Sequence, residues 1–76
     1  MTKSLPVLTP RKVLKALKRA GFYVDHTRGG HYYLKHPVRA ELRVTLGLHF
    51  KDLKREVLSS IIGQAGMTVE EFLKLL

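Results

Sequence analysis

Apolar residues recur at helical spacing near the start of the chain. Residues 1–8 are expected to form a loose leader, after which Thr9 and Pro10 provide an N-cap and a first helical residue. The apolar positions that follow predict a helix with one buried face, and they are Val13, Leu14, Leu17 and Ala20. Gly21 is typical of the residue just past a helix end, so we expect the helix to end there.

Three short segments with strand-like patterns follow this helix. We expect strands over residues 22–27, 31–36 and 41–46, joined by turns at Arg28-Gly29-Gly30 and at residues 37–40. The last segment alternates apolar and polar side chains, which indicates a strand buried on one face only. The three segments therefore predict an antiparallel meander with one face against a core.

Two further helices are predicted in the last third of the chain. The first runs over about residues 52–65, ends at Gly66, and carries an apolar stripe formed by Val57, Leu58, Ile61, Ile62 and Ala65. Thr68 and Glu71 have the spacing of a capping box and mark the start of a short last helix. Its inward-facing residues are expected to be Phe72, Leu73 and Leu76.

The element order predicts an α+β fold in a single domain over residues 1–76. A helix, three antiparallel strands and a helix, with a short extra helix at the C-terminus, should place all helices on one face of the sheet. This α-β-β-β-α order resembles that of the double-stranded-RNA-binding domain. The other sheet face is then left for solvent or a ligand.

Charge is unevenly distributed along the chain. Fourteen Lys and Arg against six Asp and Glu give a formal net charge of +8, and residues 1–50 hold ten of the basic but only two of the acidic residues. This uneven distribution favours a protein surface that binds a polyanion over a basic surface that only meets solvent. The chain has no cysteine, no membrane-length apolar run and no secretory signal pattern, so we expect a cytoplasmic protein without disulfides.

An RNA partner suits this pattern better than a DNA groove, because phosphate contacts require only positive charge within reach. Tyr32 and the apolar Leu34 are two residues apart, so they are expected on the same, buried face of the strand. Tyr33 is therefore the tyrosine expected on the outer sheet face. It could stack on a base or simply fill a cross-strand pair. The predicted RNA-binding residues are Arg11, Lys15, Lys18, Arg28, Tyr33, Lys35, Arg39 and Arg43.

Among four histidines, His31 has the position that best suits acid–base chemistry. It directly follows Gly29 and Gly30 and is the first residue of a predicted strand. A rigid sheet would therefore hold it beside a glycine turn that a substrate backbone can approach closely. A surface histidine in a tight hairpin is the alternative interpretation. His49 could approach His31 if the second and third strands pair. The spacing of the histidines and the lack of clustered carboxylates predict no metal site.

Several segments together resemble one known family, the HicA toxins. They are the Gly21-Phe22 helix end, Gly29-Gly30-His31, Arg43-Val44-Thr45, His49, Asp52-Leu53-Lys54 and the run from Leu58 to Gly66. The resemblance covers about residues 9–66. It implies a fold like the double-stranded-RNA-binding domain and a toxin of a type II toxin–antitoxin system that cleaves messenger RNA. It also implies a partner antitoxin, HicB, that blocks the toxin.

The family's active histidine follows Gly and then Ser or Thr, and the matching residue here is His31. Gly30 departs from the usual hydroxyl residue. We therefore expect a metal-independent mRNA interferase with His31 as its catalytic residue, no cofactor, Gly29, Gly30 and His49 as auxiliary residues, and a monomeric free state. Arg28 and Lys35 would stabilise the negative charge on the phosphate oxygens.

Two other functions fit the same sequence. A non-catalytic RNA-binding module of the same fold would keep the basic surface and lose nothing when His31 is replaced. An interaction protein whose basic face holds an acidic partner would show little RNA affinity and no steep salt dependence.

Overall fold

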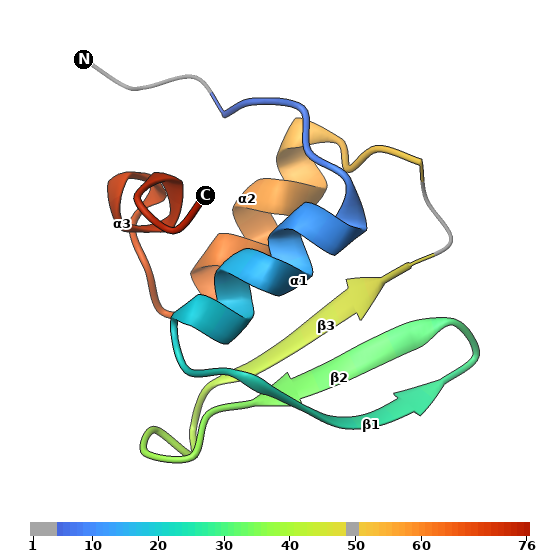
Figure 1. Ribbon diagram of the computed structural model, residues 1–76, viewed down its shortest axis with the longest axis vertical. Helices are drawn as coiled ribbons and strands as arrows, with labels where there is room; N and C mark the ends of the chain where they lie inside the picture. The colour runs from blue at the N-terminus through green and yellow to red at the C-terminus, as the bar shows by residue number, and fades with distance from the viewer. Residues whose placement is uncertain (1–4, 49–50) are drawn as a thin grey trace.

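The computed structural model describes residues 5–48 and 51–76 of the chain. Three strands form one antiparallel sheet in the order β1-β2-β3, and the helices cover one of its faces (Figure 1). This arrangement confirms the predicted α+β fold. The elements are α1 (Pro10–Arg19), β1 (Tyr23–Arg28), β2 (His31–Lys35), β3 (Arg43–Gly47), α2 (Arg55–Gln64) and α3 (Val69–Leu73).

The first helix begins where its capping residues predict. The Thr9 hydroxyl accepts a hydrogen bond from the backbone N–H of Lys12 at 3.3 Å, and Pro10 occupies the first turn, where its missing donor costs nothing. The helix packs Val13, Ala16 and Leu17 into the core. Its opposite side carries exposed basic residues, so α1 is strongly amphipathic.

The β1–β2 hairpin turns on two glycines. Gly29 has φ 56° and Gly30 has φ 80°, the left-handed backbone that a two-residue hairpin turn of the favoured twist requires. Arg28 pairs with His31 across this turn, so β1 extends one residue further than the 22–27 predicted. The turn is shaped for glycine at residue 30, because a side chain there would be strained.

A β-bulge interrupts β1 at Asp25. Val24 pairs with Leu34, but the next pair joins His26 to Tyr33, which leaves Asp25 as the extra residue. Side chains therefore do not alternate regularly between the two faces of the sheet along β1. Bulges bend a strand and re-aim its side chains, and this one brings two consecutive polar residues to one side of the sheet.

The strands β2 and β3 differ slightly from their expected limits. The second ends at Lys35 rather than residue 36, because the ring of His36 bonds to the turn that follows. The third runs from Arg43 to Gly47 rather than over 41–46, in register with β2. Leu34, Val44 and Leu46 point from the sheet into the core, each at most 1% exposed.

The start of α2 corrects the sequence-based expectation by three residues. Leu53 is buried and bridges to Leu8, with its N–H donating to the Leu8 carbonyl oxygen at 2.9 Å. A residue in this extended pairing cannot also begin a helix, so α2 starts at Arg55. The same bridge ties Leu8 to the core, although the sequence placed it in a loose leader.

The C-terminal helices bear out the capping prediction but not every apolar position. Thr68 and Glu71 form the capping box, and donation from the Thr68 backbone N–H lowers the pKa of Glu71. Phe72 is fully buried. Val57 and Leu76 were expected to face inward but are 40% and 47% exposed, and Leu75 packs against the core instead of Leu76.

The helices in the described part of the chain are all too short or too polar to cross a membrane.

Candidate functional site

His31 stands at the first position of β2, directly after the two-glycine turn. Its side chain is half-buried, and its Nδ1 lies 3.2 Å from the carbonyl oxygen of Gly29. A carbonyl oxygen only accepts, so Nδ1 donates the proton in this hydrogen bond. The contact therefore favours the tautomer with its lone pair on Nε2 and fixes the direction in which the ring points.

A hollow of about 440 Å³ lies beside His31 at the edge of the sheet. Its size is within the range of small-molecule sites. Gly47, the partner of His31 in the β2–β3 register, leaves the space opposite the ring without a side chain. The hollow is lined by His31, Thr45 and Gly47 of the sheet and by Glu56, Val57, Ser60, Ile61 and Gln64 of α2.

The α2 side of this hollow was missed by sequence reasoning. The Gln64 side chain accepts a hydrogen bond from the backbone N–H of Thr45 at 3.1 Å, which fastens α2 to the outer edge of β3. This contact brings Glu56 and Ser60 to the same hollow as His31. Their position depends on how α2 docks, and no spacing in the sequence signals it. The exposure of Val57 also follows, because it lines the hollow.

Five of the predicted residues lie together on the outer face of the sheet, the face away from the helices. Leu34 points inward from β2 and Tyr32 packs against the core, so the alternate residues of this strand point outward. Cross-strand pairing places Arg28 beside His31, and Arg43 beside Lys35. The outer-face set is His31, Arg28, Tyr33, Lys35 and Arg43.

Asp25 and His26 of β1 form a group with Tyr33 of this outer-face set. The rings of His26 and Tyr33 stack with centroids 4.5 Å apart and planes 7° from parallel. The Asp25 carboxylate lies 2.8 Å from His26 Nδ1 and 3.5 Å from Lys35 Nζ. The hydrogen bond from His26 is the largest cause that lowers the pKa of Asp25, and the Lys35 charge adds to it.

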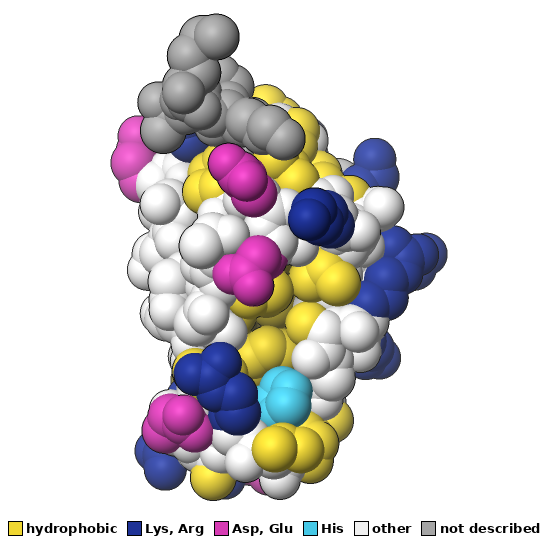
Figure 2. All heavy atoms as spheres, turned by 90° about the vertical axis from the view of Figure 1, so that its left-hand side faces the viewer, with side chains coloured by type: hydrophobic (Ala, Val, Ile, Leu, Met, Phe, Trp, Pro, Cys, Tyr) yellow, Lys and Arg dark blue, Asp and Glu magenta, His cyan; other side chains and the backbone are white. Residues whose placement is uncertain are grey.

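The other predicted basic residues lie elsewhere. Arg11, Lys15 and Lys18 are exposed on α1, which belongs to the helical layer on the opposite face of the sheet. On the side of the molecule shown in Figure 2, Lys and Arg side chains gather along the right-hand edge. Arg39 follows the end of β2 opposite to His31 and pairs with Glu41 at 3.5 Å. The structure thus separates two basic surfaces.

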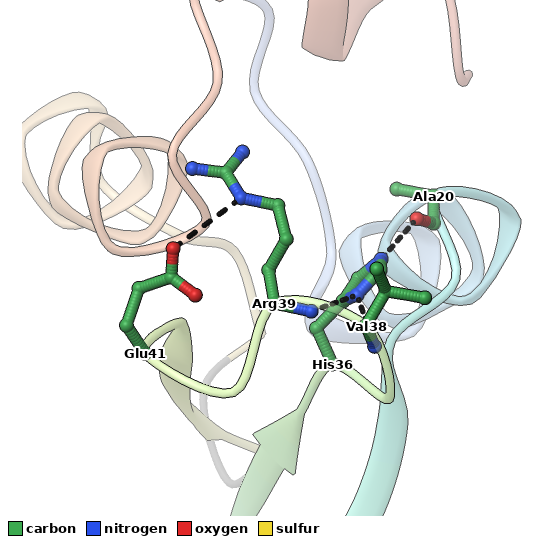
Figure 3. Close-up of polar contacts among 5 residues, drawn as sticks. All are labelled: Ala20, His36, Val38, Arg39 and Glu41. Atoms are coloured by element: carbon green, nitrogen blue, oxygen red, sulfur yellow. Dashed lines mark hydrogen bonds and ion pairs between the residues drawn. The ribbon is translucent and has the colours of Figure 1, made fainter.

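His36 has a structural position rather than a place near His31. Its Nδ1 accepts hydrogen bonds from the backbone N–H groups of Val38 and Arg39, and its Nε2 donates to the Ala20 carbonyl oxygen at 3.1 Å (Figure 3). The ring also meets Phe22 edge-on. It therefore joins the end of α1 to the turn between β2 and β3.

Gly21 makes room for this ring. Its φ of 100° suits glycine alone, and an added Cβ would lie 2.8 Å from His36 Nε2. The glycine that the sequence assigned to a helix end thus has a second role, because it admits the His36 ring against the α1 terminus.

Replacing His36 with alanine is expected to lower the free energy of unfolding by about 1–2 kcal/mol, because three backbone groups lose their partner. Urea denaturation of the variant and the wild type measures the difference. Thr27→Ala, a change at an exposed site on β1, is the matched control. An unchanged unfolding midpoint for His36→Ala would contradict the structural role.

Two of the sequence-based expectations concern the surroundings of His31. His49 lies outside the described residues. Among residues 5–48 and 51–76, no three His, Cys, Asp or Glu side chains gather in a group that could hold a metal ion.

Comparison with known proteins identifies one family. A search of curated proteins found no match. The family model described as the HicA toxin of bacterial toxin–antitoxin systems matches residues 10–67, which run from the start of α1 to just beyond α2. The matched region includes the hairpin, His31 and the helix that completes its hollow. Because it covers well over half of the 76 residues, the chain belongs to the HicA toxin family.

Proposed function

We propose that this toxin acts as an endoribonuclease on messenger RNA, with His31 as its catalytic residue. The observation that carries the proposal is the setting of His31. A rigid strand and the Gly29 carbonyl hold its ring beside an open hollow, on the same sheet face as Arg28, Lys35 and Arg43. General acid–base catalysis requires a group held firmly beside the space that the substrate enters.

The proposed reaction breaks the RNA backbone by internal transfer. The ribose 2′-oxygen attacks phosphorus and loses its proton, while the bond from phosphorus to the 5′-oxygen breaks and that oxygen gains a proton. His31 Nε2 transfers one of these protons. Glu56 supplies a carboxylate in the same hollow for the other. Arg28 and Lys35 would stabilise the charge that develops on the phosphate oxygens.

This chemistry requires no metal ion, because side chains carry both protons and cations of the protein offset the phosphate charge. We therefore propose a metal-independent reaction without a cofactor. Cleavage of a defined RNA by purified protein, in buffer containing EDTA, is the test. Loss of cleavage in EDTA and its return with added Mg²⁺ would contradict this part of the proposal.

A HicB-like antitoxin is proposed as the protein partner. A blocking protein has to cover His31 and should present acidic side chains to Arg28, Lys35 and Arg43. We propose that the toxin is a monomer when free and that it acts in the cytoplasm, where messenger RNA is found.

A non-catalytic RNA-binding module is the second candidate. The observation in its favour is Gly30, whose φ of 80° suits glycine at the position where the family usually has a hydroxyl residue. Such a module would bind RNA through the same outer face and leave it intact. Cleavage by the wild type, absent in a His31 variant that still binds RNA, separates the two functions.

The salt dependence of RNA binding tests which basic surface contacts phosphate. Arg43→Ala is expected to weaken binding and to reduce the slope of log K against log salt by about 0.7, the value for one phosphate contact on a single strand. Fluorescence anisotropy at several salt concentrations measures it. Lys74→Ala, on an exposed lysine at the end of α3, is the control.

The same measurement on Lys18→Ala decides the proposed contribution of Arg11, Lys15 and Lys18 on α1. A reduced slope would bring α1 into the RNA interface together with the sheet. An unchanged slope for Arg43→Ala would remove the outer sheet face from it.

A further inference from the structure

The His26–Tyr33 stack is the feature of the outer sheet face that catalysis by His31 leaves unexplained. Tyr33 is half-buried beneath the His26 ring, whereas the His26 side chain remains 54% exposed. One face of the imidazole is covered by the tyrosine, so its exposed area lies on the other face and the edges. The stack therefore presents a flat ring surface to solvent.

The bulge at Asp25 is what makes this arrangement possible. Consecutive residues of a regular strand point to opposite faces, so a carboxylate could not reach the ring of the next residue on the same face. The irregular register between Val24 and His26 brings Asp25 to 2.8 Å from His26 Nδ1. Bulges that re-aim a side chain occur next to functional sites.

Asp25 holds the His26 ring in place. The hydrogen bond from His26, followed by the positive charge of Lys35, lowers the pKa of Asp25, so its carboxylate is charged at neutral pH and accepts from Nδ1. The ring is thereby fixed at its edge by Asp25 and on one face by Tyr33. A group fixed before binding loses less conformational entropy when a ligand stacks on it.

The stack lies next to the catalytic position. Along β2, Tyr33 is two residues from His31, which corresponds to about 7 Å on the same face. Along β1, His26 is two residues from Arg28, the cross-strand partner of His31. Lys35 and Arg43 form the next outward pair beyond the stack. An RNA strand that crosses His31 and continues toward these cations would pass over the His26 ring.

We propose that the His26–Tyr33 stack is a subsite for one unpaired nucleobase next to the scissile phosphate. The base stacks on the open face of His26, while Lys35 and Arg43 contact the backbone beyond it. This inference rests on the proposed RNA cleavage at His31 and specifies its substrate as single-stranded RNA. A base in a duplex is already covered by its neighbours on both faces, so it has no face left for the imidazole.

Binding is measured in the His31→Ala background, so that RNA is not cut. A fluorescein-labelled single-stranded oligoribonucleotide is titrated with His31→Ala protein and with proteins that also carry His26→Ala, His26→Phe or Thr27→Ala. We expect His26→Ala to weaken binding about tenfold, within the range of base–aromatic stacking. His26→Phe, which keeps a flat ring, should remain within about threefold of the parent. Thr27 pairs with Tyr32 and lies on the opposite face of β1 from His26. Thr27→Ala should therefore leave binding unchanged.

A second binding experiment identifies which nucleobase of the RNA stacks on His26. A single abasic nucleotide is moved along the oligoribonucleotide, and at one position it should weaken binding by the same factor as His26→Ala. The abasic RNA at that position should lose no further affinity for the His26→Ala protein. Additive losses at every position would overturn the assignment of a base to this ring. Equal binding by the parent and by His26→Ala would also overturn it.

The two proposals fail separately. In wild-type background, His26→Ala should raise KM about tenfold and leave kcat within about twofold. If His31→Ala retains cleavage, the proposed catalytic role fails whatever His26 does. If His31→Ala is inactive but His26→Ala binds and cleaves as the wild type does, catalysis by His31 stands and the stacking subsite is wrong.

Discussion

Replacing His31 with alanine is expected to slow RNA cleavage by about 10²–10⁴-fold, the usual contribution of one positioned general acid or base. The reason is direct, since in the proposed reaction the imidazole transfers a proton at the scissile bond. The measurement is the rate at which purified wild-type and variant proteins cut a defined RNA in buffer containing EDTA. RNA binding should persist, because the outer-face cations are untouched.

The control for this experiment is a second substitution at the same site. His31→Gln keeps a polar side chain of similar reach but cannot act as an acid or base near neutral pH, so it should be as inactive as His31→Ala. Circular dichroism and thermal unfolding establish that both variants fold. A folded His31→Gln protein that cuts RNA at the wild-type rate would remove the histidine from the chemistry.

Phe72→Ala is expected to lower the free energy of unfolding by about 3–5 kcal/mol, the usual cost of removing a buried aromatic ring. Phe72 is fully buried although it lies beyond the region that matches the family model. Small domains are stable by only about 5–15 kcal/mol, so this loss would remove much of the total. Urea denaturation of the wild type and variant measures it.

Leu76→Ala is the matched control, because it also truncates an apolar side chain at the same end of the chain, but at a site that is 47% exposed. It should change the free energy of unfolding by no more than about 0.5 kcal/mol. If Phe72→Ala costs as little as Leu76→Ala, α3 does not contribute to the core in solution.

Features set by neighbouring residues were predictable from the sequence. The Thr9 cap, the Gly29-Gly30 turn and the Thr68–Glu71 capping box each depend on side chains within four residues. Their hydrogen bonds and dihedral angles are local, so the residue types alone indicate them. The element order follows because these local signals separate the periodic segments.

Features that depend on distant parts of the chain were not predictable. The bulge at Asp25 follows from how β1 pairs with β2, and the late start of α2 follows from the bridge between Leu53 and Leu8. Helical periodicity placed Val57 on the apolar stripe. It could not show that this part of α2 borders a hollow at the sheet edge.

The candidate site likewise contains one residue that the sequence indicates and others that depend on distant parts of the chain. His31 was predicted as the catalytic residue from its position after two glycines and from the family resemblance. The docking of α2 brings Glu56 to its hollow, and the bulge pairs Asp25 with the stacked His26 ring. Both additions require packing between segments, and the sequence alone carries no signal for either.

Growth after induced expression in bacteria tests the central claim, a toxin that acts through RNA cleavage by His31, most directly. Wild type, His31→Ala and Thr27→Ala are induced to matched protein levels, and total RNA is examined on a gel. We predict growth arrest and messenger RNA decay with wild type and Thr27→Ala, and neither with His31→Ala. Arrest and RNA decay of equal extent with His31→Ala, or intact RNA in cells arrested by the wild type, would contradict the account.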